Sequence, residues 1–119
     1  MVFLKFKIMK REFRLLKNYD FQSVIQQKRS AANKSFVVYV KKNDLNKMRV
    51  GVTVGNKYGC AVLRNKAKRQ VREMVKDMFD FSLAVDIVII IRKEFINRTF
   101  QKNNEELHYI YKKLIEKVD

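Results

Sequence analysis

The chain has 119 residues, with 27 Lys or Arg against 12 Asp or Glu, and a formal net charge of +15. Because 47% of the residues are hydrophobic, a core can form and wholesale disorder is excluded, while so much positive charge predicts a polyanionic partner. The single cysteine, Cys60, excludes an intrachain disulfide and favours a reducing compartment, for which we predict the cytoplasm.

No internal repeat, linker or low-complexity stretch divides the chain. We therefore predict one domain over residues 1–119, with residues 1–10 as a flexible N-terminal extension. The longest apolar run, residues 87–91, is far too short to cross a bilayer, so we expect no membrane-spanning segment, and we predict no membrane partner.

The first half of the chain predicts one helix and two strands. Asn18 or Asp20 can cap a short helix that runs to about Lys28, in which apolar side chains recur at i, i+3 and i+4. Residues 35–42 alternate in polarity and are rich in β-formers, and residues 49–55 resemble them. A polar turn separates the two segments, so we predict that they pair as a hairpin.

The second half predicts a long helix, a strand and a final helix. The long helix covers about residues 61–79, and the apolar segment 86–92 suits the middle of a sheet. The last helix starts near Asn103 or Asn104, where Asn103 and Glu106 fit the N-cap geometry. The predicted order is α-β-β-α-β-α, an α+β two-layer sandwich with helices packed on a small sheet.

Cations without acidic neighbours distinguish the long helix. From Lys57 to Arg72 there are six basic residues and no acidic one, whereas Lys and Arg on a solvated helix usually alternate with Glu. Unpaired cations on a rigid face favour phosphate contact, because each neutralised phosphate releases counterions. An amide such as Asn65 can also reach a base edge or a 2′-hydroxyl. The alternative is a basic face that is merely solvated.

The same segment carries a family resemblance. Residues 57–73 (KYGCAVLRNKAKRQVRE) resemble the signature of the bacterial ribonuclease P protein, in which a Lys-x-Gly-x-Ala-Val loop opens a helix with Arg-Asn-Arg-x-x-Lys-Arg. The resemblance covers about residues 11–115. Further matches lie in order at residues 14–15, 20–21, 36–39, 49–54 and 86–92. The chain departs from the pattern at Lys66, where the family usually has arginine, and at Asn56 and Cys60, where lysine and a polar residue are common.

The resemblance implies a left-handed βαβ crossover, against the general rule, and a role as accessory subunit of an endoribonuclease. Family members bind a catalytic RNA subunit and the 5′ leader of precursor tRNA; no protein partner is required. The positions matching the contacts to the RNA subunit are Lys57, Arg64, Asn65, Lys66, Lys68, Arg69 and Arg72.

The leader cleft of the family lies between the first helix and one face of the sheet. Phe21 and Ile25 match positions that line it, although helical spacing alone favours a core role for Phe21. The alternation of the strands adds Val37, Tyr39, Arg49 and Thr53 to the same face. A mixed face of rings and cations suits single-stranded RNA.

No catalytic site is predicted on this chain. Its one histidine, His108, we interpret as a surface residue, and Cys60 has no Cys or His at metal-ligand spacing. We therefore predict no catalytic residue, metal ligand or cofactor on this chain. The resemblance implies that Mg²⁺ is held by the RNA subunit. Two alternatives remain: a ribosomal or other structural RNA-binding protein, and a membrane-surface protein, which the absence of Trp disfavours.

Overall fold

The computed structural model describes residues 11–27, 29–55 and 57–118. The predicted extension over 1–10 and the departure at Asn56 lie outside the described residues. Within them the chain forms three α-helices, four strands and two short 3-10 helices. The elements in chain order are η2 (Arg11–Phe13), α1 (Asn18–Gln26), β1 (Ser30–Ala32), β2 (Phe36–Lys42), β3 (Arg49–Val54), α2 (Ala61–Met78), β4 (Val85–Ile91), η3 (Lys93–Asn97) and α3 (Phe100–Val118).

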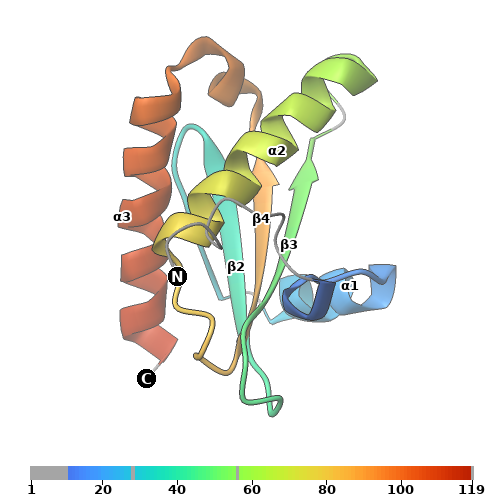
Figure 1. Cartoon of the computed structure of the whole chain (residues 1–119), viewed down its shortest axis with the longest axis vertical. Coiled ribbons are helices and arrows are strands. Elements are labelled where there is room, and N and C mark those ends of the chain that lie inside the picture. Colours follow the sequence, from blue (N-terminus) through green and yellow to red (C-terminus); the bar gives the residue numbers. More distant parts are fainter. Residues whose placement is uncertain (1–10, 28, 56, 119) are drawn as a thin grey trace.

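The four strands form one mixed sheet in the order β1-β2-β4-β3 (Figure 1). The central place predicted for the apolar strand is confirmed, because β4 pairs with β2 on one side and with β3 on the other. The predicted hairpin of β2 with β3 is wrong. Both faces of β4 are apolar, which suits the middle of a sheet that is covered on both faces, and β4 takes that place between β2 and β3.

The chain forms a hairpin one strand earlier, between β1 and β2. The strand β1 was not predicted, since its three residues are small and carry no alternation. It pairs antiparallel with β2, with Ser30 opposite Tyr39. Asn33 fixes the turn, because its Oδ1 accepts the backbone N–H groups of Ser35 and Phe36.

The crossover from β3 through α2 to β4 joins two parallel strands. In Figure 1 both strands point upward, α2 lies in front of the sheet, and the chain passes from β3 leftward to β4. A right-handed crossover would pass to the right in this view. The crossover is therefore left-handed, as the family resemblance implies.

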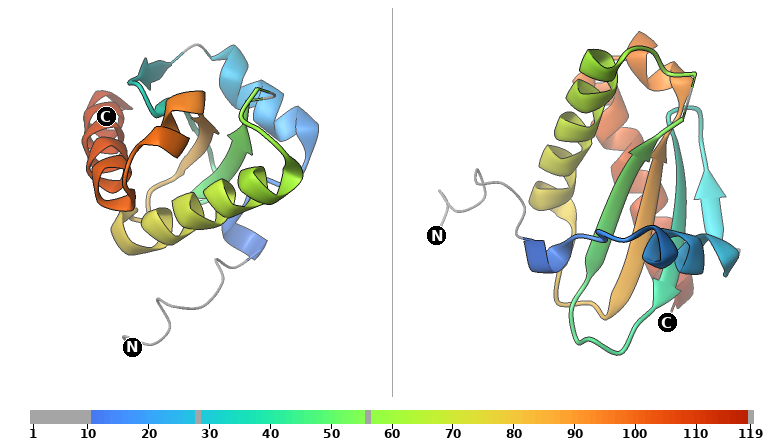
Figure 2. Two further views of the ribbon diagram at one scale, coloured as in Figure 1. Left: turned by 90° about the horizontal axis from the view of Figure 1, so that it is seen from above. Right: turned by 90° about the vertical axis from the view of Figure 1, so that its right-hand side faces the viewer.

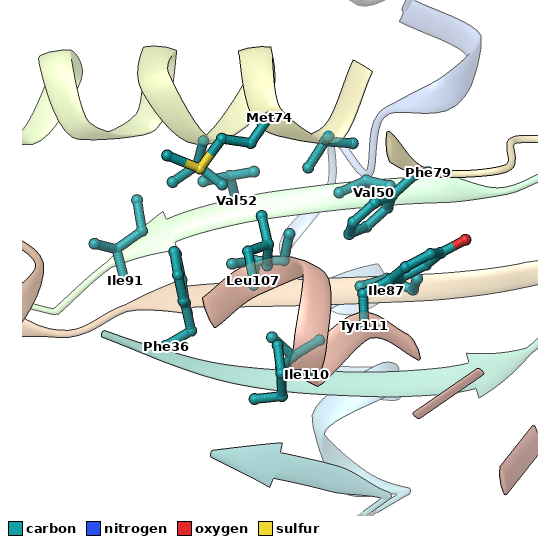
Figure 3. Close-up of a cluster of buried hydrophobic side chains, with 14 of the residues drawn as sticks. Phe36, Val50, Val52, Met74, Phe79, Ile87, Ile91, Leu107, Ile110 and Tyr111 are labelled. Carbon is teal, nitrogen blue, oxygen red and sulfur yellow. The ribbon is translucent and has the colours of Figure 1, made fainter. Parts of the chain in front are cut away.

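Helices α2 and α3 cover one face of the sheet and bury the main core against it. Met74 of α2 and Leu107 of α3 meet the inward side chains of the strands (Figure 3). Phe79 stacks on Tyr111 with ring centroids 3.9 Å apart. Helix α1 lies across the other face (Figure 2). Among the described residues, none of the helices has the length and apolar content needed to cross a bilayer.

The predicted start of the last helix is wrong. Helix α3 begins at Phe100, where the hydroxyl of Thr99 accepts the N–H of the residue three positions on at 3.1 Å. Asn103 does not cap it, because its side chain is buried and accepts a hydrogen bond from the Ser35 hydroxyl at 2.8 Å. That bond ties α3 to the start of β2.

The predicted caps of the first helix are also wrong. Neither Asn18 nor Asp20 is the N-cap residue of α1; Lys17 holds that position without a side-chain bond, and its carbonyl accepts the N–H groups of the first turn. The side chain of Asp20 is thereby left to reach the sheet.

Candidate RNA interface

The basic surface is built on α2, a helix of 18 residues whose buried side is formed by Ala67, Val71, Met74 and Val75. These residues recur every three or four positions and pack on β3, which fixes the rotation of the helix. The loop before it contains Gly59 with φ 145°, a backbone conformation that side chains rarely adopt. A preformed turn therefore leads into a rigid helix with a defined outer face.

The predicted cations surround the exposed side of α2. Lys57, Asn65, Lys66 and Arg69 are exposed, and Arg64, Lys68 and Arg72 are half-buried. At 100° per residue Arg64, Lys68 and Arg72 form one stripe along one side of the helix. Arg69 lies directly opposite the buried side, and Lys66 lies on the other side of Arg69 from this stripe. None of the six cations pairs with a carboxylate in the part of the chain that the structure describes.

A further arginine joins this surface from another segment. Arg14 bridges to Val50 of the edge strand β3 and lies close to Arg72. Burial lowers the pKa of the Arg72 guanidinium, and the positive charge of Arg14 lowers it further. Two like charges held together are more stable when an anion lies between them. The N–H at Nε of Arg64 is also buried without a partner among the described residues.

Cys60 stands at the start of α2 and is exposed. The backbone N–H groups of Leu63 and Val62 lower the pKa of its thiol, because they stabilise the thiolate. The thiol is therefore a reactive marker at the edge of the basic surface.

The predicted leader residues gather on the opposite face of the sheet, around α1. Strand register places Val37, Ile90 and Thr53 in one row across β2, β4 and β3, and Tyr39 and Val88 in the next row. Val37, Tyr39 and Thr53 are half-buried. The row of Val37 and Thr53 therefore forms an open strip of sheet beside α1.

Helix α1 packs on this face through a small cluster that includes Val24 and Val88. Phe21 lies over Gly51, where a side chain would meet its ring. Phe21, Ile25 and Tyr39 pack against the cluster while staying half-buried. These side chains thus serve the packing of α1 and also border the open strip.

Arg49 has two carboxylate neighbours on the same face. Its Nε and one terminal nitrogen donate to the two oxygens of Asp86 at 2.9 and 2.7 Å, and its other terminal nitrogen lies 3.8 Å from Asp20 of α1. Hydrogen bonding to Asp86 raises the pKa of the Arg49 guanidinium. Asn43 also donates to Asp86 at 2.8 Å. Arg49 therefore holds α1 to the sheet with a charge that is already balanced.

Sequence reasoning missed this arrangement and the placement of Arg14. The sequence predicted Asp86 only as the first residue of a strand. Its pairing with Arg49 follows from the register of β3 against β4, which places the two residues opposite each other. No His, Cys, Asp or Glu cluster suited to a metal ion occurs among the described residues.

Comparisons with known proteins identify the family of the chain. The family model for ribonuclease P matches residues 9–115. The ribonuclease P protein component of Mesoplasma florum is 40% identical, over 84% of this chain and 93% of its own length. That of an Exiguobacterium species is 42% identical, over 88% and 92%.

Solved structures show the same fold. The ribonuclease P protein of Staphylococcus aureus superposes with a TM-score of 0.76 at 38% identity, covering 84% of this chain and 93% of that one. The protein from Thermotoga maritima gives 0.69 at 37% identity, over 79% and 90%. The chain therefore belongs to the ribonuclease P protein family, and its role is that of the protein subunit in tRNA 5′ processing.

Proposed function

We propose that α2 and the loop before it bind the catalytic RNA subunit of ribonuclease P. The observation that carries this proposal is the set of six cations between Lys57 and Arg72 that have no carboxylate partner among the described residues. On a rigid helix such cations meet phosphates without first giving up an ion pair, and each contact releases counterions. Asn65, on the exposed side, adds a donor and an acceptor for a base edge or a 2′-hydroxyl.

The opposite face would hold the 5′ leader of precursor tRNA. Next to the open strip, in the neighbouring row of the sheet, Tyr39 offers an aromatic ring at a half-buried position, where bases of a single strand can stack. Phe21 and Ile25 would form the wall on the α1 side. Arg49 would act indirectly, by fixing α1 through Asp86 and Asp20. The two RNA partners would thus meet opposite faces of one small domain.

The division of labour follows from the side chains available. Hydrolysis by a protein nuclease needs metal-binding carboxylates or a histidine acid–base pair, and catalysis here would belong to Mg²⁺ ions held by the RNA subunit. This chain would supply affinity for the substrate and fixed cations near the phosphates, lowering the demand for dissolved salt. Its place of action would be the cytoplasm, where precursor tRNA is made.

The test combines the protein with a bacterial ribonuclease P RNA and precursor tRNA at low magnesium, and measures 5′ maturation. We expect stimulation that shrinks when the leader is cut to a nucleotide or two. Tight binding to ribosomal RNA without any stimulation of cleavage would overturn the proposal in favour of a structural RNA-binding role.

A further inference from the structure

A pocket of about 190 Å³ lies on the flank of α2 that carries Lys66. We call it the Phe100 pocket. Leu63, Lys66 and Gln70 line it from α2, and Phe95, Ile96 and Phe100 line it from the segment that follows β4. This segment lies beside the N-terminal half of α2, at the top of Figure 1.

The Phe100 pocket has both polar and apolar walls: Lys66, Gln70 and Arg98 stand beside apolar side chains that are partly open to solvent. Leu63, Ile96 and Phe100 are 39%, 45% and 46% exposed, while Phe95 and Tyr58 form a buried aromatic base. Large apolar side chains gathered at the surface mark an interaction site more often than chance exposure. A volume near 190 Å³ holds roughly six waters at about 30 Å³ each, which suits one ring system and excludes a helix.

The charges around the Phe100 pocket favour a ring that is attached to a phosphate, as a nucleic-acid base is. Lys66 is exposed and pairs with no carboxylate in the described ranges, whereas Arg98 at the rim is paired with Glu106. Gln70 adds an amide that can donate to and accept from a base edge. The larger groove between α2 and α3, called the acidic groove below, differs. Asp77, Glu105 and Glu116 line it beside Lys112 and Lys113, so its carboxylates outnumber its lysines and disfavour phosphate.

We propose that the Phe100 pocket receives one unpaired base of the RNA subunit. The base stacks on the ring of Phe100, Gln70 contacts its edge, and Lys66 meets the adjoining phosphate. The inference rests on the proposed binding of the RNA subunit by α2, since Lys66 belongs to the same continuous surface. It also gives Lys66 a distinct task, because a point charge suffices for a single phosphate where the usual arginine would offer a fork.

The experiment measures the affinity of the RNA subunit for four variants by titration at fixed salt. Phe100→Ala should weaken binding about 5- to 150-fold, the range for loss of one stacked base. Phe100→Tyr, which keeps the ring, should stay within about twofold of wild type. Tyr109→Ala removes an exposed ring of α3 beside the acidic groove and serves as the matched control, with unchanged affinity expected.

Arg69→Ala separates the two proposals. If Arg69→Ala weakens binding and Phe100→Ala does not, the Phe100 pocket is not a base site and the function of α2 stands. If neither variant weakens binding, both the base site and the proposed function of α2 are wrong. Chemical probing of the RNA gives a second readout: one unpaired nucleotide should be protected by the wild type and exposed again with Phe100→Ala. An identical protection pattern for both proteins would overturn the inference.

Discussion

Replacing Gly51 by alanine tests how α1 is seated on the sheet. The new Cβ would lie 2.5 and 2.6 Å from two ring carbons of Phe21, and 3.1 Å from the Cβ of Leu15. Carbon atoms in contact sit about 3.5–4.0 Å apart, so the ring must retreat by roughly 1 Å. Overpacking of this kind costs about 1–3 kcal/mol. The retreat shifts the wall of the proposed leader cleft and leaves α2, on the other face, in place.

Urea unfolding measures the loss of stability, and titrations with precursor tRNA and with the RNA subunit measure the effect on binding. We expect Gly51→Ala to lower the free energy of unfolding and the affinity for precursor tRNA, with unchanged affinity for the RNA subunit. In the double variant Gly51→Ala/Phe21→Leu the smaller side chain makes room for the new Cβ. Its loss of unfolding free energy should therefore be smaller than the sum of the losses of the two single variants, by about 0.5 kcal/mol or more. Wild-type stability of Gly51→Ala, or strictly additive losses, would refute the packing described for Phe21.

Three further changes test the cleft and the loop. Asp86→Asn removes the carboxylate that accepts two hydrogen bonds from Arg49 and leaves only Asp20, at 3.8 Å, so urea unfolding should show a loss of about 1.5–3 kcal/mol. A smaller loss than that of an exposed control such as Asp44→Asn would contradict the pairing. Tyr39→Ala should weaken binding of precursor tRNA and spare mature tRNA, and an equal loss for both would remove Tyr39 from the leader cleft. The rate of Cys60 alkylation should reach its half-maximum at a lower pH than that of an unperturbed thiol, because backbone N–H groups lower the pKa of the Cys60 thiol. Bound RNA subunit should slow the same reaction, and an unaltered rate would place Cys60 outside the interface.

Strong periodicity made α2 and β4 predictable. The predicted helix 61–79 and the observed Ala61–Met78 differ by one residue, because the apolar stripe and the preceding glycine loop agree on its limits. The strand β1 could not be predicted, since Ser30–Ala32 acquires its conformation only by pairing with β2. The predicted hairpin of β2 with β3 was wrong because strands that follow each other in the sequence need not be neighbours in the sheet, and here the later strand β4 lies between them.

The candidate site was predictable where charge alone defines it. The cations of α2 lie on the outside because the apolar residues of the helix recur on one side and turn inward. No acidic residue stands among them from Lys57 to Arg72. The surroundings of Arg49 and Arg14 depend on strand register and on a bridge to β3, which no local pattern encodes. The Phe100 pocket likewise joins segments about 35 residues apart, through packing of the core beneath it.

The salt dependence of binding to the RNA subunit tests most directly whether the bare cations of α2 neutralise phosphates. Arg64→Ala and Arg69→Ala should each weaken binding and flatten the plot of log affinity against log salt by about 0.7–0.9 for each phosphate that is no longer neutralised. Lys112→Ala, which removes a cation beside the acidic groove, is the matched control and should leave the slope unchanged. Slopes that are the same for wild type, Arg64→Ala and Arg69→Ala would contradict the assignment of α2 as the RNA-binding helix.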